Sequence, residues 1–568
     1  MSENTKPMVY GIDLGTTYSA ISYMDDSNNA TIINNPDGGQ ITASAVFFEE
    51  GNYTVGDTAK ESASIDPDNF VGLIKREIGS KWRKEFFGVE HSPESISSLI
   101  LKYMVKGAEM AGHSVKDVVI TCPAYFNEAE RAATKAAGEI AGLNVLAVVD
   151  EPIAAAISYG LGMAGQLKES GEGDCSTKQV IVYDLGGGTF DVTVINVAPD
   201  GVQVVCSDGD HKLGGADWDN ALRDVLLDKL NLDNPDAGDP MSDPETAAAL
   251  QLTVEKTKKS LSQRETAKAT IACPDGKVKV SVTREEFEEA TRTLLERTIS
   301  FTDAMIEKAR SIAKDNGSSE KIDEFLLVGG STYMPQIMAM VESRYKDSLG
   351  VEPKLYEPNY AVSKGAAAYG NIKAIQDAFI KKMEELKEKE PDKPEVDIED
   401  KAKQELADEF GLEVTTITET IETKVRTVAS KSIGIRVLNK EKKPVCYNLI
   451  KKQTPVPCCK SQQFPVSEAN ATTLPLVVFS NNMDEVATEL DYCVELGNAE
   501  MALTPGLPAG AKIEVIFSLD ENGRLELTAR DITNDKHITV EFTVTDALTE
   551  GEIDEIKKKV AELEMADV

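Results

Sequence analysis

The sequence of 568 residues is poor in several features that would point to particular classes of protein. It contains four histidines, and its eight cysteines include no Cys-x-x-Cys pair, so neither a zinc site nor a disulfide framework is indicated. No run of about eighteen apolar residues occurs, and this argues against a membrane-spanning helix. The polar start, from Ser2 to Lys6, lacks the pattern of a secretion signal, and we expect a cytoplasmic protein.

Positive charge is also scarce. The 60 Lys and Arg residues face 96 Asp and Glu residues, which gives a formal net charge of −36. Such a chain repels polyphosphate and anionic membrane surfaces, so we expect neither nucleic acid nor a membrane as its main partner. The hydrophobic content of 41% is ample for ordinary cores, and the length predicts roughly two to four domains.

Two stretches share one pattern, in which a short apolar strand runs into Asp-Leu-Gly and then into small residues. The first is residues 9–17 and the second is residues 180–189. A turn of Gly and Thr lets backbone N–H groups and hydroxyls approach phosphate oxygens, while the Asp at the strand end faces the phosphates through a divalent cation. A single copy would favour a plain hairpin turn. Two copies with matching flanks predict a duplicated half-domain that grips one nucleotide from both sides.

Residues 1–375 alternate strand-like and helical stretches, which is typical of an α/β domain. One unit runs from a strand at 118–124 to a helix that Asn127 can cap. A third glycine-rich turn, at 329–332, follows an apolar strand and precedes a helix that we expect to begin near Pro335. Alone, this third turn could equally be an ordinary connection between a strand and a helix.

The rest of the chain divides into three parts. Residues 376–428 form an acidic helical linker or insert, in which a short helix at 398–410 is interpreted as a solvated, charged helix. Residues 429–546 contain strands whose spacing predicts a β-sandwich of roughly eight strands. Residues 547–568 carry a helix that begins with a capping box at Thr549.

These motifs resemble those of one family closely, the 70-kDa heat-shock protein (DnaK-like) chaperones. The matching strings are residues 11–19, 123–127, 150–152, 183–192, 213–215 and 328–332. The resemblance covers nearly all of residues 8–375 and is looser over 430–545. It implies an actin-like ATPase domain of duplicated ribonuclease-H-like halves, an all-β sandwich that binds peptides, and a short C-terminal helix, in a divergent, short branch with a truncated lid.

The resemblance implies a Mg²⁺-dependent ATP hydrolase and a role for each matched residue. Asp13 and Asp184 would hold Mg²⁺ largely through waters, and Lys75, by itself a candidate solvated surface lysine, would lie near the γ-phosphate. The implied catalytic residues are Asp13, Thr16, Lys75, Glu151, Asp184 and Thr189. The implied residues around ATP or ADP are Gly15, Thr16, Thr17, Tyr18, Gly186, Gly187, Gly188, Thr189, Gly214, Gly215, Glu255, Lys258, Lys259, Ser262, Gly329, Gly330, Ser331 and Tyr333. K⁺ is a further cation that the resemblance allows.

The sequence departs from the family pattern at the adenosine end. Lys259 stands where an arginine is usual, and Tyr333 replaces the arginine expected after Gly-Gly-Ser-Thr. Asn359 replaces a familiar aspartate. The ring of Tyr333 can still stack on adenine. We therefore expect a changed affinity for the nucleotide rather than a different nucleotide.

The linker and the C-terminal helix depart from the pattern as well. Residues 423–430 take the place of a leucine-rich docking segment, which weakens the inference of normal coupling between the domains. The lid is reduced to a stub at 547–568, so a trapped peptide would lack its usual cover. We expect such a peptide to dissociate fast.

The expected function is that of an ATP-dependent molecular chaperone, in which hydrolysis controls the binding of extended apolar segments of unfolded proteins. The positions that match the peptide cleft, each of which could equally be sandwich core, are Ile433, Ile435, Phe464, Leu474 and Leu476. A J-domain co-chaperone and a nucleotide-exchange factor are the implied partners. The alternative is a non-cycling, nucleotide-bound co-chaperone or scaffold. An actin-like filament protein or a sugar kinase could share the nucleotide fold, but neither explains the β-sandwich.

Overall fold

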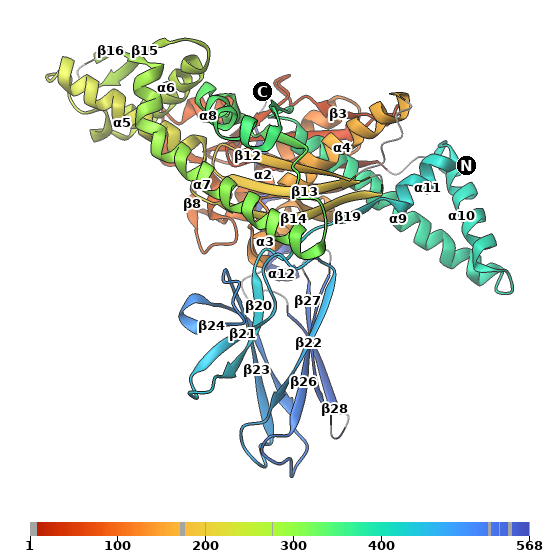
Figure 1. Ribbon diagram of the computed structural model, residues 1–568. Helices are drawn as coiled ribbons and strands as arrows, with labels where there is room; N and C mark the ends of the chain where they lie inside the picture. Colours follow the sequence, from red (N-terminus) through yellow and green to blue (C-terminus); the bar gives the residue numbers. More distant parts are fainter. Residues whose placement is uncertain are drawn as a thin grey trace.

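The molecule has two lobes, each built on a six-stranded sheet, and a β-sandwich that lies beneath them (Figure 1). This computed structural model describes residues 8–170, 177–198, 200–274, 276–520, 524–532, 534, 536–542 and 548–566. We call residues 8–170 the first lobe and residues 177–355 the second lobe. No helix within the described residues combines the length and the apolar character needed to cross a membrane.

The sheet of the first lobe has the strand order β11-β10-β1-β2-β3, with the short β4 paired to β2. The first of the two predicted hairpins is confirmed, because β1 and β2 pair antiparallel on either side of the glycine turn. The strands are β1 (Val9–Asp13), β2 (Tyr18–Met24), β3 (Ala30–Ile33), β4 (Thr42–Ala43), β10 (Asp117–Cys122) and β11 (Asn144–Asp150).

The sheet of the second lobe follows the same path, β18-β17-β12-β13-β14, and carries β19 at its far edge. β12 and β13 form the second predicted hairpin, and β12 pairs in parallel with β17 as β1 does with β10. The predicted duplication of a half-domain is thus confirmed by the topology. The strands are β12 (Lys178–Leu185), β13 (Phe190–Ala198), β14 (Gly201–Asp210), β17 (Glu324–Val328), β18 (Pro353–Leu355) and β19 (Lys424–Arg426).

Helices and small sheets cover these two sheets. The cap predicted at Asn127 is confirmed, since its side chain accepts a hydrogen bond from the backbone N–H of Glu130. The helices are α1 (Asp57–Ser62), α2 (Pro93–Met110), α3 (Glu128–Ile140), α4 (Glu151–Ser170), α5 (Gly215–Asp233), α6 (Pro244–Gln263), α7 (Arg284–Asn316), α8 (Pro335–Tyr345) and α9 (Ala361–Lys389). The further strands are β5 (Ala45–Glu49), β6 (Asn52–Val55), β7 (Phe70–Gly72), β8 (Lys84–Phe86), β9 (Val89–His91), β15 (Thr266–Cys273) and β16 (Gly276–Thr283).

The acidic segment after the second lobe is more ordered than the sequence predicts. The boundary expected at residue 375 falls inside α9, and two helices follow it, α10 (Glu395–Phe410) and α11 (Val414–Glu422). The interpretation of residues 398–410 as a solvated helix is wrong, because Ala402 and Leu406 are 0% and 1% exposed and pack toward α9. Figure 1 shows α10 and α11 beside α9, at the point where the chain enters β19.

The predicted β-sandwich consists of a five-stranded sheet, β24-β21-β20-β23-β25, and a four-stranded sheet, β22-β26-β27-β28. The nine strands are one more than the roughly eight expected, and they enclose a common core around Phe517 and Leu527. They are β20 (Ser432–Leu438), β21 (Pro444–Ile450), β22 (Cys458–Pro465), β23 (Thr473–Asn481), β24 (Ala487–Glu489), β25 (Val494–Ala502), β26 (Lys512–Leu519), β27 (Leu525–Asp531) and β28 (Lys536–Phe542).

The C-terminal segment does not lie over the sandwich, which corrects the expectation of a lid stub. The helix α12 (Glu550–Ala561) begins with the capping box predicted at Thr549, and it packs its apolar face on α2 and α3 of the first lobe. Val560 is 1% exposed in that contact. The following strand β29 (Glu564–Met565) pairs in parallel with β6. The first lobe therefore supplies the apolar cover that this helix needs.

Candidate functional site

The two glycine-rich turns meet at the base of a cleft between the lobes. A Cβ atom on Gly187 would overlap the side chain of Thr17, and one on Gly188 would overlap Thr16. Glycine is therefore required there because the turns of the two lobes touch each other. The sequence analysis accounted for these glycines only by the close approach of their backbone to phosphate oxygens.

The cleft has a cavity volume of about 620 Å³. Of the predicted catalytic and nucleotide-binding residues, three do not line it, namely Gly188, Gly214 and Glu255. The predicted residues that do line it are Asp13, Gly15, Thr16, Thr17, Tyr18, Lys75, Glu151, Asp184, Gly186, Gly187, Thr189, Gly215, Lys258, Lys259, Ser262, Gly329, Gly330, Ser331 and Tyr333. Asn359 lines it as well.

At the inner end of the cleft, buried carboxylates surround one lysine. Lys75 is 5% exposed, so it is not a solvated surface lysine, and its Nζ lies 2.5 Å from Oε1 of Glu151. Asp13 ends β1 and accepts a hydrogen bond from the hydroxyl of Thr121 at 3.3 Å. Burial opposes the charge on Lys75, but Glu151 and Asp13 together raise its pKa above the ordinary value.

The carboxylates carry more negative charge than Lys75 can balance. Burial, and then the charge of Glu151, raise the pKa of Asp13 to about 7 and that of Asp184 well above its ordinary value. Asp191, which sequence reasoning missed, is 1% exposed and its pKa is raised for the same reasons. It follows Phe190 in the second motif, and its place in a buried strand beside the turn was the available clue.

This deficit of positive charge fits a divalent cation. Within the described ranges, no three His, Cys, Asp or Glu side chains are grouped closely enough to hold a metal ion directly. The site thus fits Mg²⁺ held through waters by Asp13 and Asp184 better than Mg²⁺ in a cage of protein ligands.

An arginine that the sequence analysis missed supports the second glycine turn. Arg76 donates from Nε and Nη2 to the carbonyl oxygen of Gly188, at 3.2 and 2.8 Å, and Nη2 lies 2.7 Å from Oδ2 of Asp217. Asp217 in turn accepts a hydrogen bond from the backbone N–H of Gly214 at 2.8 Å. The first lobe therefore holds the second glycine turn in place. The position of Arg76 next to Lys75 was the only indication in the sequence.

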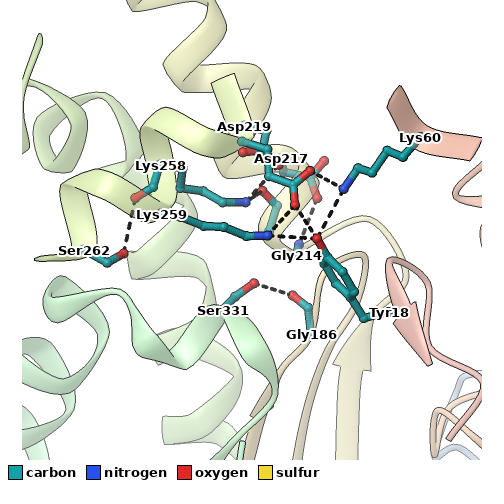
Figure 2. Close-up of polar contacts among 12 residues, drawn as sticks. Tyr18, Lys60, Gly186, Gly214, Asp217, Asp219, Lys258, Lys259, Ser262 and Ser331 are labelled. Carbon is teal, nitrogen blue, oxygen red and sulfur yellow. Dashed lines mark hydrogen bonds and ion pairs between the residues drawn. The ribbon is translucent and has the colours of Figure 1, made fainter. Parts of the chain in front are cut away.

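A network of charges closes the outer end of the cleft (Figure 2). The hydroxyl of Tyr18 donates to Oε1 of Glu255 at 2.8 Å and accepts from Nζ of Lys259 at 2.8 Å. Lys60, another residue that the sequence analysis missed, forms an ion pair with Glu255. Burial opposes ionisation of Glu255, but Lys60 and Lys259 lower its pKa to about 2. This network joins the first lobe to α6 of the second.

Residues of α5, of α6 and of the third glycine turn line the side of the cleft that the second lobe supplies. Lys258 pairs with Asp219 at 2.8 Å and donates to the carbonyl oxygen of Gly215 at 2.8 Å. The hydroxyl of Ser331 donates to the carbonyl oxygen of Gly186 at 2.8 Å, which ties the third glycine turn to the second (Figure 2). Tyr333 is 49% exposed at the mouth of the cleft, where its ring is free to meet a flat ligand.

In the sandwich, the five predicted cleft positions separate into two groups. Three of them belong to the sandwich core, which was the alternative to a place in the peptide cleft. They are Ile433, Ile435 and Leu476, each at most 3% exposed. Phe464 and Leu474 are only partly buried. The ring of Phe464 meets that of Tyr447 edge-on, with centroids 5.3 Å apart, so an aromatic pair joins β22 to β21.

The linker connects the sandwich to the second lobe through backbone pairing. β19 pairs in parallel with β14, and Val202 lies opposite Val425. Beyond it, the hydroxyl of Thr427 donates to Oδ2 of Asp150 at 3.0 Å, next to Glu151 of the cleft. Lys452 of the sandwich pairs with Asp208 at 3.2 Å.

Comparisons with known proteins agree with this architecture. The family model described as "Hsp70 protein" matches residues 9–90, 82–443 and 414–568. The chain belongs to the Hsp70 family. The "Chaperone protein DnaK" of Mycoplasmopsis synoviae (strain 53) is 34% identical over 573 residues, covering 99% of this chain and 83% of the relative. That of Halobacterium salinarum (strain ATCC 29341 / DSM 671 / R1) is 34% identical over 562 residues, covering 97% of this chain and 77% of the relative.

Family membership carries a coarse functional statement. As an Hsp70 protein, the chain is an ATP-dependent molecular chaperone with ATP hydrolase activity, and nucleotide and Mg²⁺ binding are part of that activity. Hsp70 chaperones bind unfolded polypeptides and co-chaperones in general.

Proposed function

We propose that ATP hydrolysis in the cleft between the two lobes controls the binding of extended apolar peptide segments in the β-sandwich. The observation that carries this proposal is the cleft itself, where two mirrored turns meet beside buried carboxylates that outnumber their one lysine. A nucleoside triphosphate supplies the phosphate groups that such turns bind, and its bound cation offsets the negative charge of the carboxylates.

The catalytic roles follow from the arrangement of the inner end of the cleft. Asp13 and Asp184 would hold Mg²⁺ through waters, and when bound this cation offsets charge on the phosphate oxygens. Lys75, held by Glu151 at 2.5 Å, would present its ammonium group toward the γ-phosphate. Glu151 would accept a hydrogen bond from the attacking water and so orient it. Thr16 and Thr189 offer hydroxyls from the two turns, and K⁺ is a second cation for the remaining negative charge.

The adenosine end would be held by the charge network and by the third glycine turn. Tyr333 is placed at the mouth of the cleft, where its ring can stack on the adenine base. Glu255 supports this end indirectly, through Tyr18 and Lys259, and does not itself line the cavity. The departures from the family pattern at Lys259 and Tyr333 then change the strength of nucleotide binding.

Coupling to the sandwich would pass through β19. A parallel ladder is made of backbone groups, so the loss of the leucine-rich side chains of the family linker leaves the pairing with β14 possible. Thr427 reaches Asp150, the neighbour of Glu151. A change at the γ-phosphate therefore has a short path to the linker.

On the peptide side, we propose the partly buried Phe464 and Leu474 as the apolar contacts, above a floor formed by the buried Ile435 and Leu476. Extended segments of unfolded proteins would bind there by backbone hydrogen bonds and one apolar pocket. A J-domain protein and a nucleotide-exchange factor are the proposed partners of the cycle.

The test is the ATPase rate of the full chain with and without an apolar heptapeptide. We expect a saturating peptide to change the rate, and Phe464→Ser to abolish this change while the basal rate is kept. Leu438→Ser is the matched control, since Leu438 is a 57% exposed apolar residue of β20. A rate that does not respond to peptide, with nucleotide bound, would count against the proposal. Absence of single-turnover hydrolysis would favour the non-cycling scaffold.

A further inference from the structure

The linker enters the second lobe through a transition of one residue. α11 ends at Glu422 and β19 begins at Lys424, with Thr423 alone between them, in an extended conformation with φ −64° and ψ 122°. Since neighbouring residues of a strand point to opposite faces, any shift of the helix end by one residue would turn β19 over.

The two faces of β19 are chemically different. Val425 packs against the apolar cluster beneath the sheet, whereas Lys424 and Arg426 are exposed. The register is Gly201 opposite Lys424, and the backbone N–H of Lys424 also donates to the carbonyl oxygen of Asp200 at 2.7 Å. A slip by one residue would place a charged side chain at the apolar cluster, which is costly. Pairing of the linker with β14 therefore depends on where α11 stops.

One side chain fixes that end point. Gln376 of α9 donates from Nε2 to the carbonyl oxygen of Thr423 at 2.8 Å, and the same nitrogen lies 3.4 and 3.3 Å from the carbonyl oxygens of Thr420 and Ile421. The carbonyls of Thr420 and Ile421 belong to the last turn of α11, where intrahelical donors run out, and that of Thr423 directly follows it. The preceding residue, Ile375, is fully buried among side chains of α10 and α11, so the backbone that carries Gln376 is well anchored.

We propose that Gln376 is a positioning residue that sets the register of β19 on β14, and thereby the coupling of peptide binding to ATP hydrolysis. The second part rests on the proposed function of the cleft and the sandwich. The required chemistry is a hydrogen-bond donor aimed at the C-terminal carbonyls of a helix. A carboxylate of the same shape is repelled there, and an ammonium group is accepted.

The experiment compares Gln376→Glu with Gln376→Lys in the full chain. Hydrogen–deuterium exchange of the amides at 424–426 should be about tenfold faster in Gln376→Glu, which loses the donor, and unchanged in Gln376→Lys. Gln404→Glu is the matched control, because Gln404 is an exposed glutamine of α10 whose amide donates to Oδ1 of Asp408 in the same helix at 3.0 Å. Gln376→Glu should keep the basal ATPase rate within about twofold and lose its response to the apolar heptapeptide.

Each outcome decides a separate part of the proposal. Unchanged exchange in Gln376→Glu, or equally fast exchange in Gln376→Lys, would overturn the role of Gln376 in setting the register. Faster exchange together with an intact peptide response would overturn its link to coupling. If the wild type itself does not respond to peptide, the proposed function fails, while the exchange data still decide whether Gln376 sets the register.

Discussion

The carboxyl group of Asp13 should make the nucleotide-free ATPase lobes less stable as the pH rises. Burial, and then the charge of Glu151, raise its pKa from the ordinary value of 3.8 to about 7. A difference of about three pKa units corresponds to about 4 kcal/mol. Because the folded protein holds this proton more tightly than the unfolded chain, the stabilisation is complete below about pH 4 and is lost as the pH rises through about 7.

Asp13→Asn removes this titration. Relative to the wild type, the variant should gain up to about 4 kcal/mol in the free energy of unfolding between about pH 4 and pH 7.5. The two tryptophans, Trp82 and Trp218, both lie in the ATPase lobes, so tryptophan fluorescence during urea unfolding reports on these lobes alone. Asp233→Asn, at an exposed position of α5, is the control and should show no such trend.

Adding Mg²⁺ and ADP tests the same prediction in a second way. Mg²⁺ with ADP should stabilise the wild type more at pH 7.5 than at pH 5, because the cation offsets an ionised carboxylate. The same additions should have a smaller pH dependence in Asp13→Asn. A difference in unfolding free energy between the two proteins that stays constant within about 1 kcal/mol across the range would refute the reasoning.

Three further changes test other parts of the structure. Lys75→Met should lower the single-turnover hydrolysis rate by about 100-fold or more, whereas the exposed Lys81→Met should not; equal rates would exclude the role of Lys75. Val560→Asp puts an unpaired carboxylate into an apolar contact and should release α12, seen as faster amide exchange in β6, with no change if the contact is weak. Leu476→Ser should destabilise the sandwich by about 2–4 kcal/mol in urea, and Phe464→Ser should chiefly weaken peptide binding; the reverse order would exchange the roles of core and cleft.

The features that the sequence predicted well are local ones. The two hairpin turns, the cap at Asn127 and the capping box at Thr549 depend on residues within a few positions of each other, and all are found as expected. The duplicated topology follows from the repeated motif because equal local patterns fold into equal units. The family resemblance then supplied which side chains gather in the cleft.

The contacts between distant segments were not predictable in the same way. Arg76 and Lys60 act across the lobes, and nothing near them in the chain says which turn or helix they will meet. The apolar residues of α10 alternate with many charged residues, and that composition is equally typical of a solvated helix, so the sequence did not show that one side of α10 is buried. The position of α12 depends on which apolar surface lies nearest in space, and a helical periodicity carries no information on that.

The attachment of β19 to the second lobe and of β29 to the first has a mechanical consequence. The sandwich is fastened at both of its ends, and the two fastenings lie on different lobes, β19 on the second and β29 on the first. A movement of one lobe against the other would change the distance between the fastenings, so that either the sandwich would twist or one fastening would break. β29 is held by two paired residues and β19 by three, and the C-terminal fastening would therefore be the first to give way if the buried helix α12 is loosened.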